Sequence, residues 1–390
     1  MITVDEALAR IFELALPMPT EPVPLIRAAG RVLAAPVTAR RDQPPFASSA
    51  MDGYAVQGDA VAPGAKFNVI GEAAAGHGFA GSLGKTDTVR IFTGAPIPQG
   101  ATRVIIQEDV TRAGDEIILN SSLDQSIYIR QAGADFSAGT KIAAPKLLGA
   151  TDIALLAAMN VATVPVARRP KVALIATGDE LVMPGEAPEP DQIIASNTFG
   201  LAAMIEQAGG DARILPIARD TENSLKTAFK LAQDADIIVT IGGASVGDRD
   251  LVAPVAEQLG MDRAFYKIAM RPGKPLMAGR LGRSAMLGLP GNPVSSMVCA
   301  QLFVVPLIRA MLGLGAHAAP RKTCPLEIDI PANGAREHYM RATLTDTGIA
   351  PLDRQDSALL SVLAQADALL VRPVRDGARK AGEMIEYIPL

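Results

Sequence analysis

The chain has 390 residues, a net charge of −4 and no long basic run, which argues against nucleic-acid binding, where a basic face is expected. Hydrophobic residues make up 49% and charged residues 20%, the balance of an ordered globular protein. The two cysteines and three histidines lack metal-ligand spacing, so we expect no zinc site, and two lone cysteines suit a reducing cytoplasm.

The N-terminal part is expected to form a helix and an extended linker. Thr3 and Glu6 fit a capping box, apolar residues then follow helical spacing, and the proline-rich run 17–24 closes the helix. The start of the chain lacks the basic region of a signal peptide, and no uninterrupted apolar run is long enough to span a membrane.

Short apolar runs separated by turns follow, which predicts a small β-rich lobe over residues 46–134. A helix and a short apolar run come next, near 152–159 and 161–166. We expect this piece (135–167) to pack with residues 1–45 into one linker domain, because neither piece is large enough to form its own core. The strands of the lobe are expected near 66–70, 88–92, 103–107 and 116–119.

Strands and helices alternate over residues 168–315. Near-continuous apolar strands that alternate with helices predict a buried, mostly parallel sheet, with ligands bound beyond the carboxyl ends of the strands. Residues 316–390 contain short strands and turns and predict a small C-terminal β domain. The predicted fold is therefore multidomain, α/β plus β. The strands of the sheet are expected near 171–177, 213–217, 236–241, 265–269, 275–278 and 285–289, and its helices near 198–207, 221–233, 251–259 and 294–312.

Three glycine-containing loops leave predicted strand ends in this sheet domain, at 177–180, 242–250 and 289–295. Glycine lets backbone N–H groups approach a ligand closely, and helix N-termini favour anions, so these loops suit phosphate or pyrophosphate. The alternative is that glycine and proline only make tight turns. Three such loops at one sheet edge favour the binding site, since α/β ligands collect at that edge.

Carboxylates share or adjoin these loops. Beside a phosphate they repel the ligand unless a cation lies between, and Mg²⁺ bridging one or two carboxylates to phosphate oxygens is the usual solution. Each could instead be solvated or cap a helix, Asp250 and Asp220 in particular. The residues in question are Asp179, Glu180, Asp220, Asp248 and Asp250.

A cationic stretch contains Lys267, Arg271 and Lys274, with prolines at 272 and 275. Three cations on a turn stiffened by proline could hold a tetrahedral oxyanion through charge-assisted hydrogen bonds. The alternative is a solvated surface turn.

Six segments in one order carry a family resemblance: Ser-Ala-Met-Asp-Gly-Tyr at 49–54, Thr-Gly-Ala-Pro at 93–96, Thr-Gly-Asp-Glu at 177–180, Ser-Val-Gly at 245–247, Pro-Gly-Lys-Pro at 272–275 and Leu-Pro-Gly-Asn-Pro-Val-Ser at 289–295. Together they resemble the molybdopterin molybdenumtransferase (MoeA) family, to which the C-terminal domain of gephyrin is similar. The resemblance implies that adenylylated molybdopterin and molybdate react with Mg²⁺, so that AMP leaves and the dithiolate keeps the metal. It also implies an elongated homodimer of four-domain subunits with the active site between subunits, and it makes molybdopterin adenylyltransferase a candidate partner.

The resemblance also implies roles for individual residues. Those that look catalytic are Asp52, Thr93, Glu180, Asp220 and Asp250, with Glu180 and Asp250 as candidate Mg²⁺ ligands. Those expected to bind the pterin substrate are Arg130, Asp135, Gly242, Gly243, Ser245, Gly247, Lys274, Pro290, Gly291, Asn292 and Pro293. Those expected at molybdate are Lys267, Arg271, Arg341 and Ser357.

Two residues depart from the family pattern: Arg271 replaces a lysine, and Ile241 stands where a serine is common. Arginine keeps the charge but adds a planar fork. Three alternatives remain open at this point: a gephyrin-type scaffold without catalysis, a tungstate-inserting paralogue, and a different enzyme built on the sheet domain, such as a relative of nucleotide-processing amidohydrolases. The last would not explain residues 49–54 or the C-terminal β domain.

Overall fold

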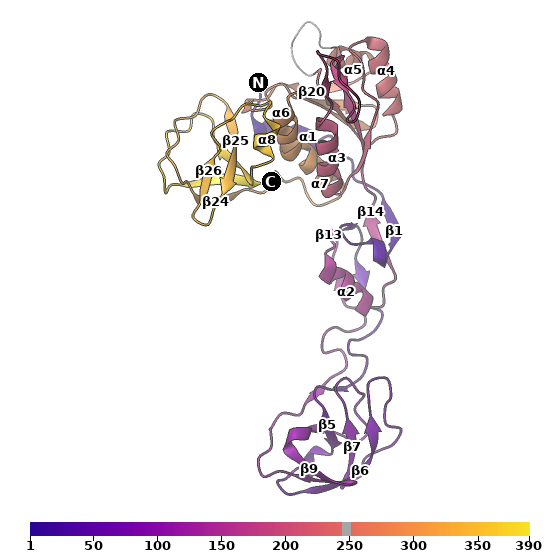
Figure 1. Cartoon of the computed structure of the whole chain (residues 1–390). Helices are drawn as coiled ribbons and strands as arrows, with labels where there is room; N and C mark the ends of the chain where they lie inside the picture. Colours follow the sequence, from indigo (N-terminus) through magenta and orange to yellow (C-terminus); the bar gives the residue numbers. More distant parts are fainter. Residues whose placement is uncertain (244–250) are drawn as a thin grey trace.

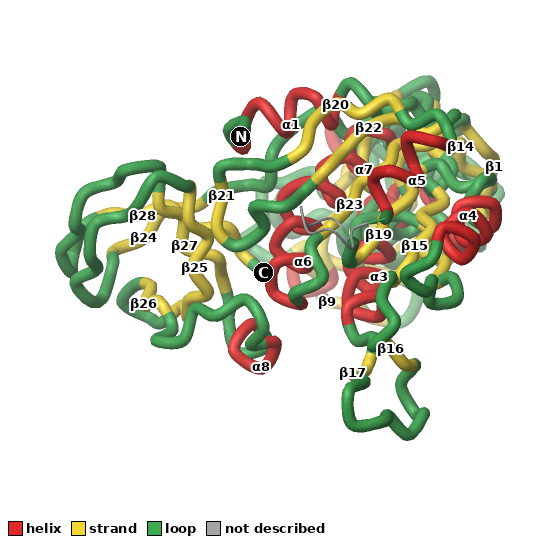
Figure 2. Tube along the Cα trace, turned by 90° about the horizontal axis from the view of Figure 1, so that it is seen from above, coloured by secondary structure: helices red, strands yellow, loops and turns green. Residues whose placement is uncertain are grey.

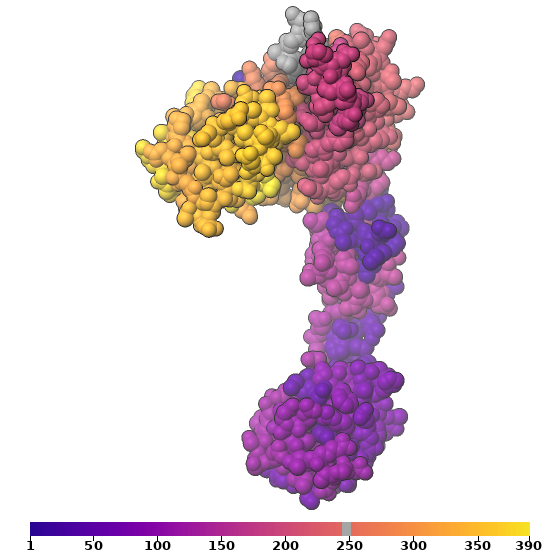
Figure 3. Space-filling model, in the orientation of Figure 1, coloured from indigo at the N-terminus to yellow at the C-terminus, as the bar shows by residue number. Residues whose placement is uncertain are grey.

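The computed structural model describes residues 1–243 and 251–390. The molecule is elongated, with a β lobe and a larger head at opposite ends of a narrow neck (Figures 1 and 3). The head contains a sheet domain and, beside it, the C-terminal β domain. Both chain termini lie in the head (Figure 1). The chain is therefore multidomain, α/β plus β, as predicted.

The β lobe is a six-stranded sheet with apolar residues packed on both faces. Along one strand, Tyr54 and Val56 face one small core while Ala55 faces the other, because successive side chains point to opposite faces of a sheet. The strand order is β8-β5-β7-β6-β10-β9, with β5 at Gly53–Val56, β6 at Lys66–Ala73, β7 at Asp87–Ile91, β8 at Arg103–Ile106, β9 at Val110–Ala113 and β10 at Glu116–Leu119. The four predicted strands are all present.

The neck is made from two distant pieces of chain. A four-stranded sheet of order β1-β14-β2-β13 and the helix α2 enclose one small core. The proline-rich run does not simply end a helix, because it contains β1, an edge strand, where proline's missing N–H is tolerated. The elements are β1 at Thr20–Pro24, η1 at Leu25–Arg27, β2 at Val32–Leu33, β13 at Lys146–Leu147, α2 at Ala150–Ala158 and β14 at Thr163–Ala167. Between neck and lobe lie β3 at Val37–Thr38 with β12 at Lys141–Ile142, and β4 at Ser48–Ser49 with β11 at Ile129–Arg130.

The sheet domain holds a six-stranded, mostly parallel sheet with helices on both faces. Val172 and Leu174 of one strand face α3, α6, α7 and the N-terminal helix α1 (Val4–Phe12), while Ala173 and Ile175 face α4 and α5. The order is β18-β15-β19-β23-β22-β20, and only β22 runs against its neighbours. The strands are β15 at Lys171–Ala176, β18 at Asp211–Ile214, β19 at Ile237–Ile241, β20 at Asp262–Tyr266, β22 at Met277–Leu281 and β23 at Ser284–Leu289; the helices are α3 at Asn197–Gln207, α4 at Glu222–Leu231, α5 at Val252–Gln258, α6 at Pro293–Cys299 and α7 at Val305–Met311.

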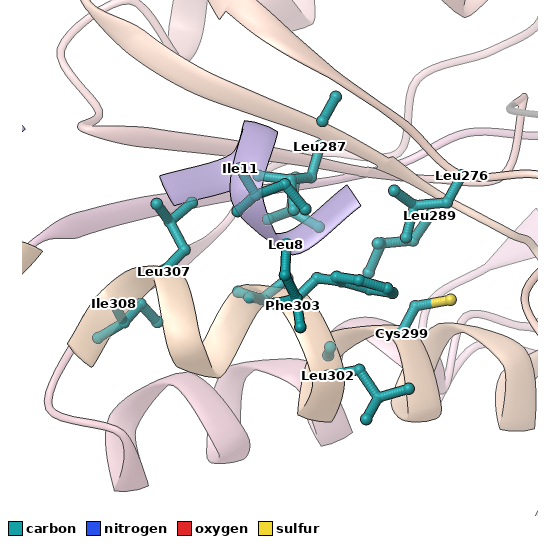
Figure 4. Packing of buried hydrophobic residues seen from close by; sticks show 14 of the residues in the cluster. Leu8, Ile11, Leu276, Leu287, Leu289, Cys299, Leu302, Phe303, Leu307 and Ile308 are labelled. Atoms are coloured by element: carbon teal, nitrogen blue, oxygen red, sulfur yellow. The ribbon is translucent and has the colours of Figure 1, made fainter. Parts of the chain in front are cut away.

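The N-terminal helix α1 (Val4–Phe12) begins at the predicted capping box of Thr3 and Glu6. Its apolar face packs against the sheet domain and not against the linker with which the sequence grouped it. Leu8 and Ile11 lie among Leu287, Phe303 and other core residues (Figure 4). Helix α1 therefore closes one face of the sheet that carries the predicted site.

The predicted long apolar helix is present but changes its hydrogen-bond pattern midway. Residues Ala300–Val304 form a π-helical turn between α6 and α7. Pro306, just beyond it, has no N–H to donate to the preceding turn. Within the described residues, the stretch Pro293–Met311 is long and apolar enough to cross a membrane, but 72% of its apolar window is buried inside the fold. Packing in the core accounts for its apolar sequence.

The C-terminal domain is a β sheet of order β21-β25-β27-β28-β24, with β26 paired to β25. Its first strand, β21, comes from the sheet domain, so Met270 and Arg271 tie the two domains together.

A short two-stranded ribbon, β16 and β17, projects from the sheet domain (Figure 2). The bounds are β16 at Leu181–Val182, β17 at Ile193–Ile194, β21 at Met270–Arg271, β24 at Lys322–Pro325, β25 at Glu337–Leu344, β26 at Ile349–Pro351, α8 at Leu360–Leu363, β27 at Ala368–Arg372 and β28 at Met384–Pro389.

Candidate active site

A pocket of about 1030 Å³ lies at the carboxyl ends of β15, β19 and β23, where the three glycine-containing loops were expected to meet. All three loops contribute to its wall, together with the β16–β17 ribbon, the start of α3 and a segment of the C-terminal domain. The residues expected from the sequence that line it are Glu180, Asp220, Gly242, Gly243, Arg271, Lys274, Pro290, Gly291, Asn292, Pro293 and Ser357.

Backbone hydrogen bonds join the three loops. Thr177 donates its N–H to the carbonyl of Ile241 over 3.0 Å, and Gly242 donates to Leu289 over 3.1 Å. Gly242 has φ +93°, and a Cβ there would lie 2.7 Å from the Thr177 carbonyl oxygen. Only glycine fits this close approach, which keeps the backbone of the second loop against the first.

The third loop is held from two sides. The side chain of Asn197, the first residue of α3, donates to the carbonyl of Gly291 over 2.7 Å. Asn292 donates to the hydroxyl of Ser357 over 2.9 Å, and Val294 donates its N–H to the Ser357 carbonyl. The C-terminal domain therefore completes one wall of the pocket.

Two of the four cations predicted for the oxyanion, which are the three of the cationic stretch and Arg341, do not line the pocket. Lys267 lies outside its wall; its backbone has φ +84°, and its carbonyl accepts a hydrogen bond from Ile2. Arg341 is fully buried behind the wall, where it donates to the carbonyls of Arg354 and Asp356. Only Arg271 and Lys274 of the predicted set present cationic side chains on the pocket surface.

Arg341 still has unused donors. Its Nε and Nη1 atoms are buried and have no hydrogen-bond partner in the described part of the chain. Burial, and then the nearby charge of Arg271, lower the pKa of the Arg341 guanidinium. Arg341 therefore has unsatisfied donors beside the charge of Arg271, and no salt bridge holds either arginine among the described residues. An anion would relieve this local excess of positive charge.

The carboxylates at the pocket are Glu180 and Asp220. The Glu180 carboxylate lies over Gly178, whose Cβ, if present, would be 2.4 Å from Glu180 Oε2. Helix α4 is capped by Thr221, which accepts from Ser224, so capping does not account for Asp220. Among the described residues no group of three metal-ligating side chains gathers. The predicted residues Ser245, Gly247, Asp248 and Asp250 lie outside the described residues.

A second group of predicted residues lies in the β lobe. Asp52 Oδ1 accepts hydrogen bonds from the N–H and the hydroxyl of Thr93, both over 2.8 Å. These bonds hold the pKa of Asp52 below its ordinary value. Arg130 is nearby on β11, which pairs with β4 ahead of Asp52, and Asp135 lies where the lobe joins the neck, its N–H donating to Gln43.

The neck separates these two groups. The lobe with β5 and β7 lies at one end of the molecule, and the strands and helices of the pocket lie at the other (Figure 1). A single chain therefore does not bring Asp52, Thr93 and Arg130 together with Glu180 and the pocket.

Comparison with known proteins assigns the family. Three family models match successive parts of the chain: the MoeA N-terminal region (domain I and II) over residues 2–160, a probable molybdopterin binding domain over 173–310, and the MoeA C-terminal region (domain IV) over 323–390. A molybdopterin molybdenumtransferase from Haemophilus influenzae is 37% identical over 399 aligned positions, which cover 100% of this chain and 98% of the relative. The chain belongs to the molybdopterin molybdenumtransferase family, the transferases of molybdenum cofactor biosynthesis.

Further members of the family agree along the whole chain. The molybdopterin molybdenumtransferase of a Nostoc species is 34% identical, covering 95% of this chain and 89% of the relative. The crystal structure of a molybdopterin biosynthesis MoeA protein from Pyrococcus horikoshii OT3 superimposes with a TM-score of 0.86 at 26% identity, covering 100% of both chains. The match extends over the N- and C-terminal regions, which a different enzyme sharing only the sheet domain would lack.

The two departures from the molybdenumtransferase pattern have different structural settings. Arg271 is exposed on the pocket wall, so its longer planar fork points into the site and not into the core. Ile241 also lines the pocket, but it is only 3% exposed and packs in the sheet-domain core, so the isoleucine is accommodated.

Sequence reasoning missed several pocket residues. Ser196 and Asn197 stand at the start of α3, and a polar pair before a predicted helix was the available signal. Arg336, the residue before β25, also lines the pocket and has no salt-bridge partner among the described residues. No local pattern marks it. The pairing of β25 with β21, which sets His338 opposite Arg271, brings Arg336 to the same pocket.

Proposed function

We propose that the chain inserts molybdate into adenylylated molybdopterin, with release of AMP and formation of the molybdenum cofactor. The observation that carries this proposal is the pocket itself, in which the glycine-containing loops, Arg271, Lys274 and Ser357 share one surface. Backbone N–H groups of such loops bind phosphates, and the adjacent cations suit a second, tetrahedral oxyanion.

The two anions divide the pocket between them. The pterin phosphates and the adenylate would lie at the strand ends, where Gly242, Gly243 and Gly291 line the pocket. Molybdate would lie at the part of the wall that Arg271 and Ser357 form, with Arg341 behind it. Ser357 contacts the loop after β23 through Asn292, so the oxyanion would lie next to the phosphates.

The carboxylate set fits Mg²⁺. Mg²⁺ keeps several waters and is held by one or two carboxylates plus substrate phosphates. Such a site does not need three gathered protein ligands, and the described residues contain no such group. Glu180 would hold the ion, together with Asp250 as the family resemblance implies. Bound there, Mg²⁺ would neutralise phosphate charge next to the carboxylates.

A homodimer would complete the site. Asp52, Thr93 and Arg130 lie at the far end of the same chain from the pocket, and a second copy can bring its lobe to that pocket. In a twofold dimer the contact is reciprocal, so two composite sites form. The location we propose is the cytoplasm, where the unpaired thiols Cys299 and Cys324 are stable. The molybdopterin adenylyltransferase would supply the substrate.

The test is AMP release from adenylylated molybdopterin, followed with and without molybdate and Mg²⁺. We expect release that needs both, with molybdenum recovered on the pterin. A protein that binds the adenylylated pterin but releases no AMP under any of these conditions would instead be a non-catalytic scaffold. Metal analysis after competition between molybdate and tungstate would identify the preferred oxyanion.

A further inference from the structure

Asp52 lies at the entrance to β5, the strand between β7 and β8 in the lobe sheet. Its side chain is tied through Oδ1 to Thr93, and its carbonyl accepts the N–H of Gln107 over 3.2 Å. The described residues donate no hydrogen bond to Oδ2. Asp52 is therefore held by the ends of both neighbouring strands with one carboxylate oxygen left open.

Arg90 of β7 lies directly beneath this turn. Its guanidinium carbon lies over two aromatic rings, 5.0 Å from the centroid of Tyr54 and 4.8 Å from that of Phe92. It donates to the carbonyl of Gly53 over 3.1 Å and to the side chain of Gln107 over 2.7 Å. Stacking and the planar fork together define the orientation of the group.

These contacts join the three strands that carry Asp52 and its partners. Gly53 follows Asp52, Phe92 precedes Thr93, and Gln107 holds the Asp52 carbonyl. A shift of the Arg90 guanidinium would therefore change the position of Phe92 relative to Gly53. Because these residues adjoin Thr93 and Asp52, it would also disturb the contact between Thr93 and Asp52. Arg90 itself is not adjacent to the open Oδ2.

We propose that Arg90 is a positioning residue, which fixes the Asp52 turn against Thr93 so that Asp52 Oδ2 is presented to the substrate. The inference rests on the proposed function, because it assumes that Asp52 acts in the transfer. Arg90 also contributes, after the two Thr93 hydrogen bonds, to the lowered pKa of Asp52. The proposed role is geometric, so it requires the fork and the stacking as well as the charge.

The test compares Arg90→Met and Arg90→Lys in the full chain, with Arg112→Met as the matched control. Arg112 is an exposed arginine of the same lobe, on β9. Among the described residues its side chain donates only to the carbonyl of Gly114, in its own turn. We expect both Arg90 variants to lower kcat about ten- to a hundredfold, the usual range for a displaced group, with the half-saturating molybdate concentration unchanged. Lysine keeps the charge without the fork, so it should not restore kcat.

The second readout is the titration of the Asp52 carboxyl, followed by NMR of ¹³C-labelled aspartate and assigned with Asp52→Asn. Loss of the Thr93 contacts should raise its pKa in both Arg90 variants and leave it unchanged in Arg112→Met. Gln107→Ala removes the side-chain acceptor of Arg90 and keeps the contacts of Arg90 with Tyr54 and Phe92. It should therefore raise the pKa of Asp52 by less than the Arg90 variants do. This variant tests the proposal if an Arg90 variant does not fold.

Restoration of both kcat and the titration by Arg90→Lys would overturn the geometric role in favour of charge alone. An unmoved titration in Arg90→Met or, where that variant is unfolded, in Gln107→Ala would overturn it entirely. Wild-type turnover in Asp52→Asn would refute the assumed role of Asp52 in the transfer. The titration of Asp52 in the Arg90 variants tests the positioning role of Arg90 independently of that result.

Discussion

The side chain of Asn197 donates a hydrogen bond to the carbonyl of Gly291 over 2.7 Å, and this bond ties the start of α3 to the loop after β23. Asn197→Ala should loosen that loop and raise the half-saturating concentration of adenylylated molybdopterin about three- to tenfold, the value of one ordinary hydrogen bond. Gln207→Ala, at the exposed far end of the same helix, is the control. Equal affinity of the Asn197→Ala and Gln207→Ala variants for adenylylated molybdopterin would show that Asn197 does not contribute to substrate binding.

Shared active sites predict a specific pattern in mixed dimers. Asp52→Ala and Glu180→Ala should each fold and sharply lower AMP release as homodimers. In a twofold dimer whose sites combine the lobe of one subunit with the pocket of the other, a heterodimer of the two variants has one intact site and should regain about half of the wild-type turnover. Dimers purified through two different tags give the measurement.

The reciprocal heterodimer is the control for that experiment. A subunit carrying both substitutions, paired with a wild-type subunit, damages both composite sites and should be inactive. Sites contained within one subunit would give the opposite pattern, with half activity here and none in the first heterodimer.

Arg271→Ala should raise the molybdate concentration for half-maximal AMP release about ten- to a hundredfold, because it removes one charge-assisted hydrogen bond of about 1.5–3 kcal/mol. Arg271→Lys should recover most of the loss, and affinity for the adenylylated pterin should change much less. Lys267→Ala is the matched control, since Lys267 lies outside the pocket wall. A shift in pterin affinity without a shift in molybdate dependence would assign Arg271 to the nucleotide side.

His338 should make stability depend on pH. It is 8% exposed, its Nε2 has no partner among the described residues, and burial followed by nearby arginines lowers its pKa to about 4. The unfolded chain, with a histidine pKa near 6.5, binds the proton first, so this contribution is complete above about pH 6.5 and is lost as pH falls towards 4. The arginines are Arg271, Arg341, Arg372 and Arg336.

The full contribution of His338 is about 3 kcal/mol of unfolding free energy, from the difference between the two pKa values. His338→Phe should flatten the slope of stability against pH between 6.5 and 4, whereas His77→Ala, on an exposed turn of the lobe, should not. Urea unfolding followed by circular dichroism at several pH values measures both slopes. Parallel slopes for wild type and His338→Phe would contradict the assignment.

Local sequence determined most of the secondary structure and the side of the sheet on which the pocket lies. The capping box at Thr3, the continuous apolar strands such as β19 and the glycines of the three loops act over a few residues, so their physical effect is readable without the fold. The carboxyl ends of parallel strands share one edge, and this is why Thr177, Gly242 and Pro290 could be expected to meet.

Tertiary structure decided which of the expected residues share a surface. Lys267 and Arg271 are four positions apart, yet only Arg271 is on the pocket wall, because β21 pairs with β25 of another domain and carries Arg271 there. The same pairing brings in Arg336, which no local pattern marks. Asp52 and Glu180 were both expected in an active site between subunits, and the length of the neck separates them within one chain. Contacts between residues far apart in sequence depend on how whole elements pack, and periodicity and spacing along the chain do not contain that information.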